Sequence, residues 1–298
     1  MNKAERKGNL LGILAVISFS LTLPFTKFLT KSLNFYEIGT LRALIASSMA
    51  LLIIIYKKED WPHKSDLFKF LMTGFGVVLG FPFLVALGME TVPSGHGGVL
   101  LASLPLSTAI FSCLLSKERP SKTFWFLSFL GLVVVAAFSN SHSPLEDLSW
   151  SHGDTALFGA VLMGGFGYAQ GGHLSKKYPS WKVICFALIL TLPIIIFSSP
   201  FLIHFKIIKT TTPQNWLALL FLGLVNNLFA FFLWYKGLAL GGVAKVGQLQ
   251  LLQPFFTIFF SLILLKEQFF WQDLIFCFMI VLIVFLTSKT KFNSKDTK

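Results

Sequence analysis

Residues 253–267 read QPFFTIFFSLILLKE, and residues 104–118 read LPLSTAIFSCLLSKE. Each stretch has a proline in second place, an apolar run after it and a Lys-Glu pair at its end. When the two prolines are aligned, Gly88 also falls on Gly237, so the correspondence continues outside the two stretches. A match at a fixed separation of half the chain predicts two homologous repeats.

The composition places both repeats in a membrane. Hydrophobic residues make up 54% of the 298 positions and charged residues only 13%, and phenylalanine alone occurs 34 times. The apolar residues form blocks of about 20 residues with almost no charge, the length of a helix that spans a hydrocarbon core of about 30 Å. The sequence predicts ten such transmembrane helices, at approximately 9–29, 36–56, 67–89, 93–116, 122–140, 155–175, 182–203, 214–235, 242–265 and 269–288.

The positive charge is read as a signal of topology. The net charge is +12, and most of the 25 Lys and Arg residues fall in the N-terminal tail, in every second loop and in the C-terminal tail. Basic loops remain in the cytoplasm, so this distribution predicts a multi-pass protein of the cytoplasmic (inner) membrane with both termini cytoplasmic. Attraction to anionic lipid is expected on that face, and nucleic acid is not expected as a partner.

The two repeats are expected to lie in opposite orientations. Each holds five helices, and an odd number turns the second repeat upside down relative to the first. We expect the first repeat over 1–145, the second over 153–290 and a basic cytoplasmic tail over 291–298. Inverted repeats are typical of secondary transporters, in which two nearly equivalent conformations open a central site to either side in turn.

Several motifs resemble a known family. LRALIA at 41–46, LWYKGLALGG at 233–242 and the repeated proline and Lys-Glu endings are similar to those of EamA-type transporters in the drug/metabolite transporter (DMT) superfamily. The similarity covers essentially the whole chain. It implies an inner-membrane carrier, usually an efflux protein for amino acids, metabolites or drugs, with a central cavity walled by the first, third, fourth, sixth, eighth and ninth helices. It does not imply a particular cargo.

Polar residues in the ninth helix are the first candidates for substrate binding. Gln250, Gln253 and Thr257 share one helix face, and Pro254 cannot donate a hydrogen bond to the carbonyl of Gln250, which is expected to leave an unpaired acceptor there. Polar side chains inside the membrane mostly face the bundle or a wet cavity. The alternative is that these side chains bond neighbouring helices, and the sequence leaves both readings open.

Further candidates lie in the eighth and sixth helices. Asn227 and Trp234 share a face, and an amide beside an aromatic ring suits a zwitterionic or aromatic solute. Trp234 and Tyr235 could equally anchor the helix at the membrane surface. In the sixth helix Tyr168 and Gln170 interrupt a glycine-rich run, which is typical of close helix contact and, alternatively, of a hinge.

Four residues are candidates for coupling or gating. Arg42 lies two turns into the second helix, where it could reach the surface, bond helix-end carbonyls or bind a substrate carboxylate. Glu90, at the outer end of the third helix, could be a proton carrier or a plain helix-end charge. Pro105 and Pro254 occupy equivalent places in the two repeats.

Enzyme chemistry is not expected. The sequence has no CxxC, HExxH, GxSxG or GxxxxGK[ST] motif, so no catalytic residue, metal or cofactor is predicted. We expect a secondary transporter, and specifically an exporter, of a small organic metabolite, amino acid or drug. The alternative is a flippase for a lipid or lipid-linked precursor. The cargo, the direction, the coupling to protons or to the membrane potential, and the oligomeric state are left open.

Overall fold

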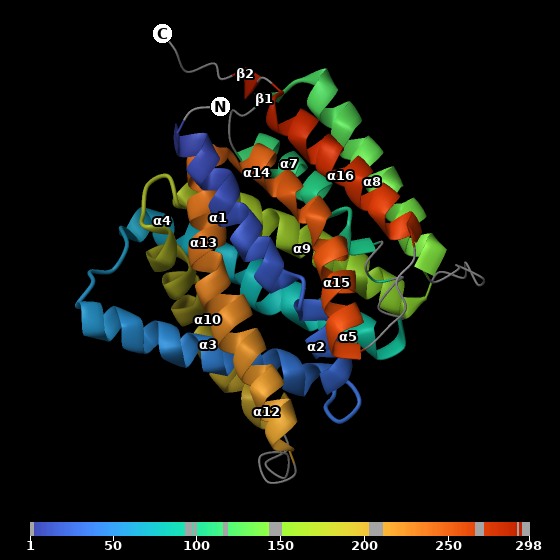
Figure 1. The fold of residues 1–298 in the computed structure, drawn as a ribbon. Helices are drawn as coiled ribbons and strands as arrows, with labels where there is room; N and C mark the ends of the chain where they lie inside the picture. Colours follow the sequence, from blue (N-terminus) through green and yellow to red (C-terminus); the bar gives the residue numbers. More distant parts are fainter. Residues whose placement is uncertain are drawn as a thin grey trace.

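The computed structural model describes residues 3–92, 97, 100–115, 119–142, 151–202, 211–265, 271–290 and 292–293. Nearly all of them are helical (Figure 1). The first half contains α1 (Lys3–Phe19), α2 (Thr22–Leu29), α3 (Phe35–Lys57), α4 (Lys64–Gly74), the π-helix η1 (Phe75–Gly80), α5 (Phe81–Thr91), α7 (Leu104–Leu115) and α8 (Lys122–His142).

The second half contains α9 (His152–Leu174), α10 (Ser180–Leu202), α12 (Pro213–Leu220), the π-helix η2 (Phe221–Phe229), α13 (Ala230–Gly241), α14 (Val243–Gly247), the 3₁₀-helix η3 (Gln248–Leu252), α15 (Gln253–Leu265) and α16 (Trp271–Ser288). Two short strands, β1 (Arg119–Pro120) and β2 (Phe292–Asn293), pair antiparallel. The start of α1 and the end of α16 lie at the same end of the molecule (Figure 1).

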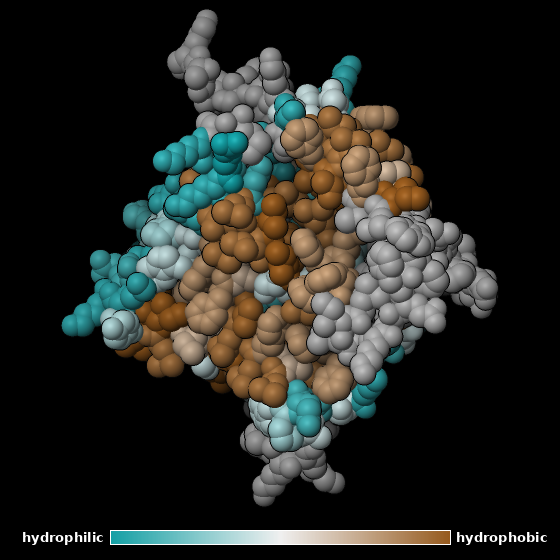
Figure 2. Space-filling view, viewed as in Figure 1, coloured by the Kyte–Doolittle hydropathy of each residue, from teal (hydrophilic) through white to brown (hydrophobic). Residues whose placement is uncertain are grey.

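Five helical segments of the described chain are long and apolar enough to cross a membrane. They are Lys3–Leu29, Phe35–Lys57, Lys64–Thr91, Ser180–Ser199 and Pro213–Gly241. Large apolar side chains also face outward, and Figure 2 shows them as a brown belt with hydrophilic residues gathered toward the ends. An exposed apolar surface of this extent, on helices long enough to span a membrane, is expected where lipid covers it. The structure is therefore that of a multi-pass membrane protein, and the count of ten spans stays a prediction.

Helices from the two halves pack along one another. α1 lies along α13 (Figure 1), and α5 packs against α9 and α3 against α10. Glycine permits the closest approaches: a Cβ added at Gly8 would lie 2.8 Å from the backbone nitrogen of Gly241, and one at Gly76 would lie 2.7 Å from the Cα of Gly167. The expectation of close helix contact at the glycine-rich face of α9 is confirmed.

The first membrane segment is broken between α1 and α2, and Pro24 explains the break. Proline has no N–H with which to bond the carbonyl four residues earlier, here that of Ser20, and its ring clashes with that carbonyl. The first segment therefore continues as α2 from Thr22 rather than as one regular helix. Pro82 in the first turn of α5 similarly follows the π-helix η1. These irregular turns lie where the candidate site is found.

The two Lys-Glu endings on which the sequence comparison began, 117–118 and 266–267, lie outside the described residues. Other helix ends are explained by their caps. Asn34 and Glu37 form a capping box at the start of α3, and Ser151 and Asp154 form one at the start of α9. Each pair satisfies backbone N–H groups that have no partner inside the helix.

A candidate solute-binding cavity

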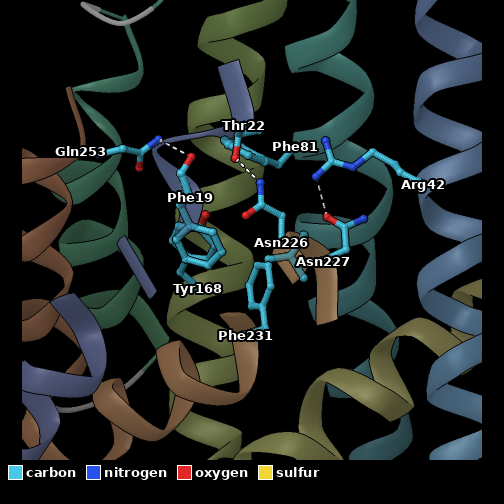
Figure 3. A pocket seen from close by; sticks show the side chains of 10 residues that line it. Phe19, Thr22, Arg42, Phe81, Tyr168, Asn226, Asn227, Phe231 and Gln253 are labelled. Carbon is cyan, nitrogen blue, oxygen red and sulfur yellow. Dashed lines mark hydrogen bonds between the residues drawn. The ribbon is translucent and has the colours of Figure 1, made fainter. Parts of the chain in front are cut away.

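A small cavity lies between segments of both halves (Figure 3). The space that the centre of a water-sized sphere can occupy is about 10 Å³, roughly enough for one water molecule. Its position is near the middle of the spans Lys3–Leu29, Lys64–Thr91 and Pro213–Gly241. The lining residues are Phe19, Thr22, Arg42, Val77, Phe81, Tyr168, Asn226, Asn227, Phe231 and Gln253.

Asn226 ties the broken first segment to η2. Its Nδ2 donates to the Oγ1 of Thr22 at 2.8 Å, and its Oδ1 accepts from the Oγ of Ser18 at 2.9 Å. Asn226 and Asn227 both line the cavity although they are consecutive. A π-turn holds more residues than an α-turn, so neighbouring side chains diverge less around the helix axis. The π-helix thus presents two amides to one space.

The three polar residues predicted on one face of the ninth helix, Gln250, Gln253 and Thr257, have two different roles. Gln253 lines the cavity and donates from Nε2 to the carbonyl of Phe19 at 3.3 Å, while the Thr257 hydroxyl donates to the carbonyl of Ser20 at 2.7 Å. These two side chains therefore satisfy backbone carbonyls at the break in the first segment. Gln250 is 3% exposed, lies beside the Tyr168 hydroxyl, and leaves both amide atoms without a well-formed hydrogen bond.

One expectation for this helix face is wrong. The carbonyl of Gln250 is not left unpaired by Pro254, because the backbone N–H of Gln253 donates to it. The reason is the 3₁₀-helix η3, whose bonds join residues three apart and so bypass the proline nitrogen. Pro254 occupies the second position of α15, and Pro105 occupies the second position of α7. Proline is tolerated at the start of a helix, and neither proline lines the cavity.

Arg42 is buried at the cavity and does not reach the surface. Its residue is 2% exposed, and its Nη2 donates to the Oδ1 of Asn227 at 2.7 Å (Figure 3). The expectation of a snorkelling side chain is therefore wrong, as is that of a bond to helix-end carbonyls. The reason is that α3 turns this position toward η2 and α10. The interpretation as a binding residue for an anionic group remains.

Aromatic rings form one wall. Phe19 and Tyr168 stack with ring centroids 6.3 Å apart and planes 12° apart, and Phe231 lies 5.3 Å and 5.7 Å from their centroids. Trp234 does not line the cavity but packs edge-on against Phe19 and Tyr168 at 5.9 Å and 5.5 Å. The Trp234 ring is fully buried, so it is not an anchor at the membrane surface.

The remaining candidates lie away from the cavity. Tyr235 is buried against Gly171 and donates its hydroxyl to the carbonyl of Gly167 at 3.1 Å. Gln170 is half-buried and does not line the cavity. Glu90 accepts from the backbone N–H of Phe35 at 2.7 Å, at the start of α3. This contact favours the interpretation of Glu90 as a helix-end charge.

Sequence reasoning did not single out Phe19, Thr22, Val77, Phe81 or Phe231. A phenylalanine in an apolar helix looks the same whether it faces lipid, a neighbour or a cavity. One signal was present: the alignment that places Pro105 on Pro254 also places Phe19 on Tyr168.

The chemistry of the cavity is that of binding. Its described lining offers a guanidinium, amides, hydroxyls and aromatic rings, with no carboxylate, thiol or imidazole. The described residues also contain no cluster of three or more His, Cys, Asp or Glu side chains that could hold a metal ion.

Charged contacts gather at one end instead. Asp66 in α4 accepts from Lys177 at 2.5 Å, from Tyr178 at 2.8 Å and from Lys69 at 2.9 Å. The turn after α9 is thereby joined to α4. The hydrogen bond to the Asp66 carboxylate raises the pKa of Lys177 above its ordinary value of 10.5.

Known proteins resemble the chain over most of its length. The pattern of the EamA-like transporter family matches residues 6–140 and, a second time, residues 151–289. YdeK of Bacillus subtilis, described as an uncharacterized transporter, is 37% identical over 283 residues, which cover 91% of this chain and 93% of YdeK. An uncharacterized transporter of Archaeoglobus fulgidus is 26% identical over 282 residues, covering 88% of this chain and 90% of its own.

A solved crystal structure of a protein superposes with a TM-score of 0.76 at 16% sequence identity, covering 95% of this chain and 98% of that one. At this identity the likeness concerns the fold alone. The double family match and the relatives, together with the apolar spans, point to transport rather than catalysis. The protein is a multi-pass membrane transporter and belongs to the EamA-like transporter family.

Proposed function

We propose that this protein is a secondary transporter that exports a small organic solute (a metabolite, an amino acid or a drug) across the cytoplasmic membrane by alternating access. In this proposal both termini are cytoplasmic and the cavity is the solute site. Transport needs neither a cofactor nor a soluble domain. The site residues are those lining the cavity, with Gln250 and Trp234 behind them.

The observation that carries the proposal is a narrow cavity that is lined by buried polar groups of several membrane spans. Arg42, Asn226 and Tyr168 line it, and each is at most 2% exposed. Burying polar groups there is costly unless they serve binding or are paired. With room for about one water, the cavity must widen and open before a solute enters or leaves. A site that has to open is what alternating access requires.

The arrangement of the two halves supports the same proposal. Phe19 and Tyr168, which the repeat alignment pairs, meet face to face at the cavity. The same alignment places α1 on α9 and α5 on α13. The contact between α1 and α13 therefore corresponds to the contact between α9 and α5. A site shared by two repeats can be opened to one side by moving one repeat, and to the other side by the equivalent movement of its counterpart.

Opening would act on the contacts around the break in the first segment. Asn226 bonds Ser18 and Thr22, and Thr257 bonds the carbonyl of Ser20, so three hydrogen bonds among five residues join α1, α2, η2 and α15. Both π-helices contribute to the lining of the cavity, η1 through Val77 and η2 through Asn226. Helices with π-turns have weakened regular bonding, which suits them to bend during opening.

The experiment compares the solutes of cells that overproduce three forms of the protein. They are the wild type, Val77→Phe, which fills the cavity, and Leu52→Phe, which changes a lipid-facing position that is 60% exposed. Small molecules in the medium and in the cytoplasm are measured by mass spectrometry. We expect the wild type and Leu52→Phe to deplete the same cytoplasmic solute and enrich it in the medium, and Val77→Phe to lose this effect at equal membrane abundance.

Equal solute profiles in all three strains would contradict solute export. A change confined to the distribution of a lipid or lipid-linked precursor between leaflets would instead support the flippase alternative. Accumulation of a solute inside the cells would keep the transporter and reverse its direction.

A further inference from the structure

The guanidinium of Arg42 has more donors than partners. Its Nη2 donates to the Oδ1 of Asn227, whereas its Nε and Nη1 are buried without a hydrogen-bond partner. The Nδ2 of Asn227 is buried and unpaired as well. Three donor atoms without a partner therefore belong to two residues that are bonded to each other, Arg42 in α3 and Asn227 in η2 (Figure 3).

No carboxylate of the described residues forms an ion pair with Arg42. Arginine stays charged in proteins, and a buried charge is normally paired or surrounded by hydrogen bonds. An amide oxygen is only a partial substitute for an anion. The missing partner is an acceptor, because every unused group at this point is a donor, and a negatively charged acceptor would also neutralise the guanidinium.

The shape of the donors selects among anions. Each fork of a guanidinium combines one N–H of Nη2 with the N–H of Nε or of Nη1, and the two parallel bonds match the two oxygens of a carboxylate. Nη2 carries two N–H groups, so its bond to Asn227 leaves one N–H for a fork with an unpaired neighbour. Around this point the wall is apolar: Phe81, Val77 and Phe231 line the same cavity as Arg42. A ligand that satisfies both features has a carboxylate at one end and an apolar or aromatic body at the other.

We propose that Arg42 and Asn227 form a carboxylate-binding site, so that the transported solute is a small organic acid or amino acid with an apolar side. The proposal rests on the proposed transport function and names its substrate class. The solute carboxylate replaces the missing counter-ion of Arg42 and receives a further hydrogen bond from Nδ2 of Asn227. The aromatic wall of Phe19 and Tyr168 packs against its apolar part.

A purely structural role for Arg42 would have a different signature. The Arg42–Asn227 bond does join α3 to η2, so its loss would lower stability if joining were the purpose of the arginine. If the guanidinium instead serves to bind a ligand, replacing Arg42 by an uncharged residue of similar length should stabilise the ligand-free protein. The reason is that the substitution removes an incompletely paired buried charge. Arg42→Met and Asn227→Asp separate these roles, since the second supplies a permanent carboxylate next to Arg42.

The experiment measures the thermal unfolding of the detergent-purified full chain with three probes that share a phenyl group. They are phenylacetate, phenylacetamide and phenethylamine. We expect phenylacetate to raise the Tm of the wild type, and the amide and the amine to leave it unchanged. The rise should be lost in Arg42→Met and in Asn227→Asp, and both empty variants should melt at or above the wild-type temperature.

Equal shifts with phenylacetate and phenylacetamide, including no shift with either, would overturn the carboxylate site. So would a phenylacetate shift that persists in Arg42→Met. The carboxylate site and the transport function can fail independently. Export of a neutral or cationic solute would contradict the carboxylate site and leave the transport function standing. A carboxylate response without any exported solute would keep the site and remove transport.

Discussion

Replacing Thr257 by valine removes one hydroxyl and keeps the shape of the side chain. That hydroxyl donates to the carbonyl of Ser20 at 2.7 Å, across the break between α1 and α2. Pro24 has no N–H to complete the α-helical bond to the same oxygen. The variant is therefore expected to leave a carbonyl without a donor in the membrane interior.

The cost follows from the state of that carbonyl. An unsatisfied buried polar group costs about 1–3 kcal/mol, and hydrogen bonds between membrane helices are worth about 0.6 kcal/mol on average and up to about 1.7. Pro24 has no N–H that could replace the lost hydroxyl as donor to the Ser20 carbonyl. We therefore expect a loss of about 1–2 kcal/mol in the free energy of unfolding. The matched control is Thr191→Val, whose hydroxyl donates to Ala187 and Leu188 inside its own helix.

The assay is reversible unfolding of the purified protein in mixed micelles, with both variants measured against the wild type. Those two carbonyls in α10 can still be reached by backbone N–H groups, so the control should change stability by less than about 0.5 kcal/mol. Equal losses in the two variants, or no loss in Thr257→Val, would refute the reasoning. The break in the first segment would then not depend on the ninth segment.

Three further predictions concern packing, the buried amide and the charged end. Gly76→Ala should destabilise by about 1–3 kcal/mol because its Cβ meets backbone, whereas Gly159→Ala, which meets only Leu84, should be neutral or slightly stabilising in the same unfolding assay. Gln250→Leu should not lower the Tm, because both amide atoms lack a well-formed bond, but it should weaken solute binding. The raised pKa of Lys177 means that its bond to Asp66 stabilises below pH 10.5 and that this contribution is lost as the pH rises further; a Tm measured against pH should show a smaller decline in Lys177→Gln.

The sequence was informative where a residue type has one physical meaning. Proline cannot donate a backbone hydrogen bond, so the irregular turns near Pro24 and Pro82 have a cause in the sequence, although the first helix was predicted without interruption over 9–29. Long apolar blocks predicted membrane spans, of which five meet the length and composition within the described residues. The small-residue face of α9 predicted close packing, and Gly167 indeed meets η1.

The sequence was ambiguous where one residue type has several roles. Gln250 and Gln253 share a helix face, yet one bonds a carbonyl of α1 and the other keeps an unpaired amide beside Tyr168. Trp234 could have been a surface anchor, and only its burial decides against this. For Arg42 the sequence left open the membrane surface, helix-end carbonyls and a substrate carboxylate; its buried partner Asn227 belongs to the other half of the chain. Such contacts between distant segments cannot be read from one sequence.

The direct test of alternating access is the labelling of one cavity position from both sides of the membrane. Cys113, Cys185 and Cys277 are replaced by alanine, and Asn226→Cys is then treated with a membrane-impermeant maleimide in intact cells and, separately, in inside-out vesicles. Leu228→Cys, fully buried on the same π-helix but outside the cavity, is the control. Our account predicts that Asn226→Cys is labelled from both sides and Leu228→Cys from neither. Labelling of Asn226→Cys from one side only, or from neither, would contradict a site that opens in turn to each face of the membrane.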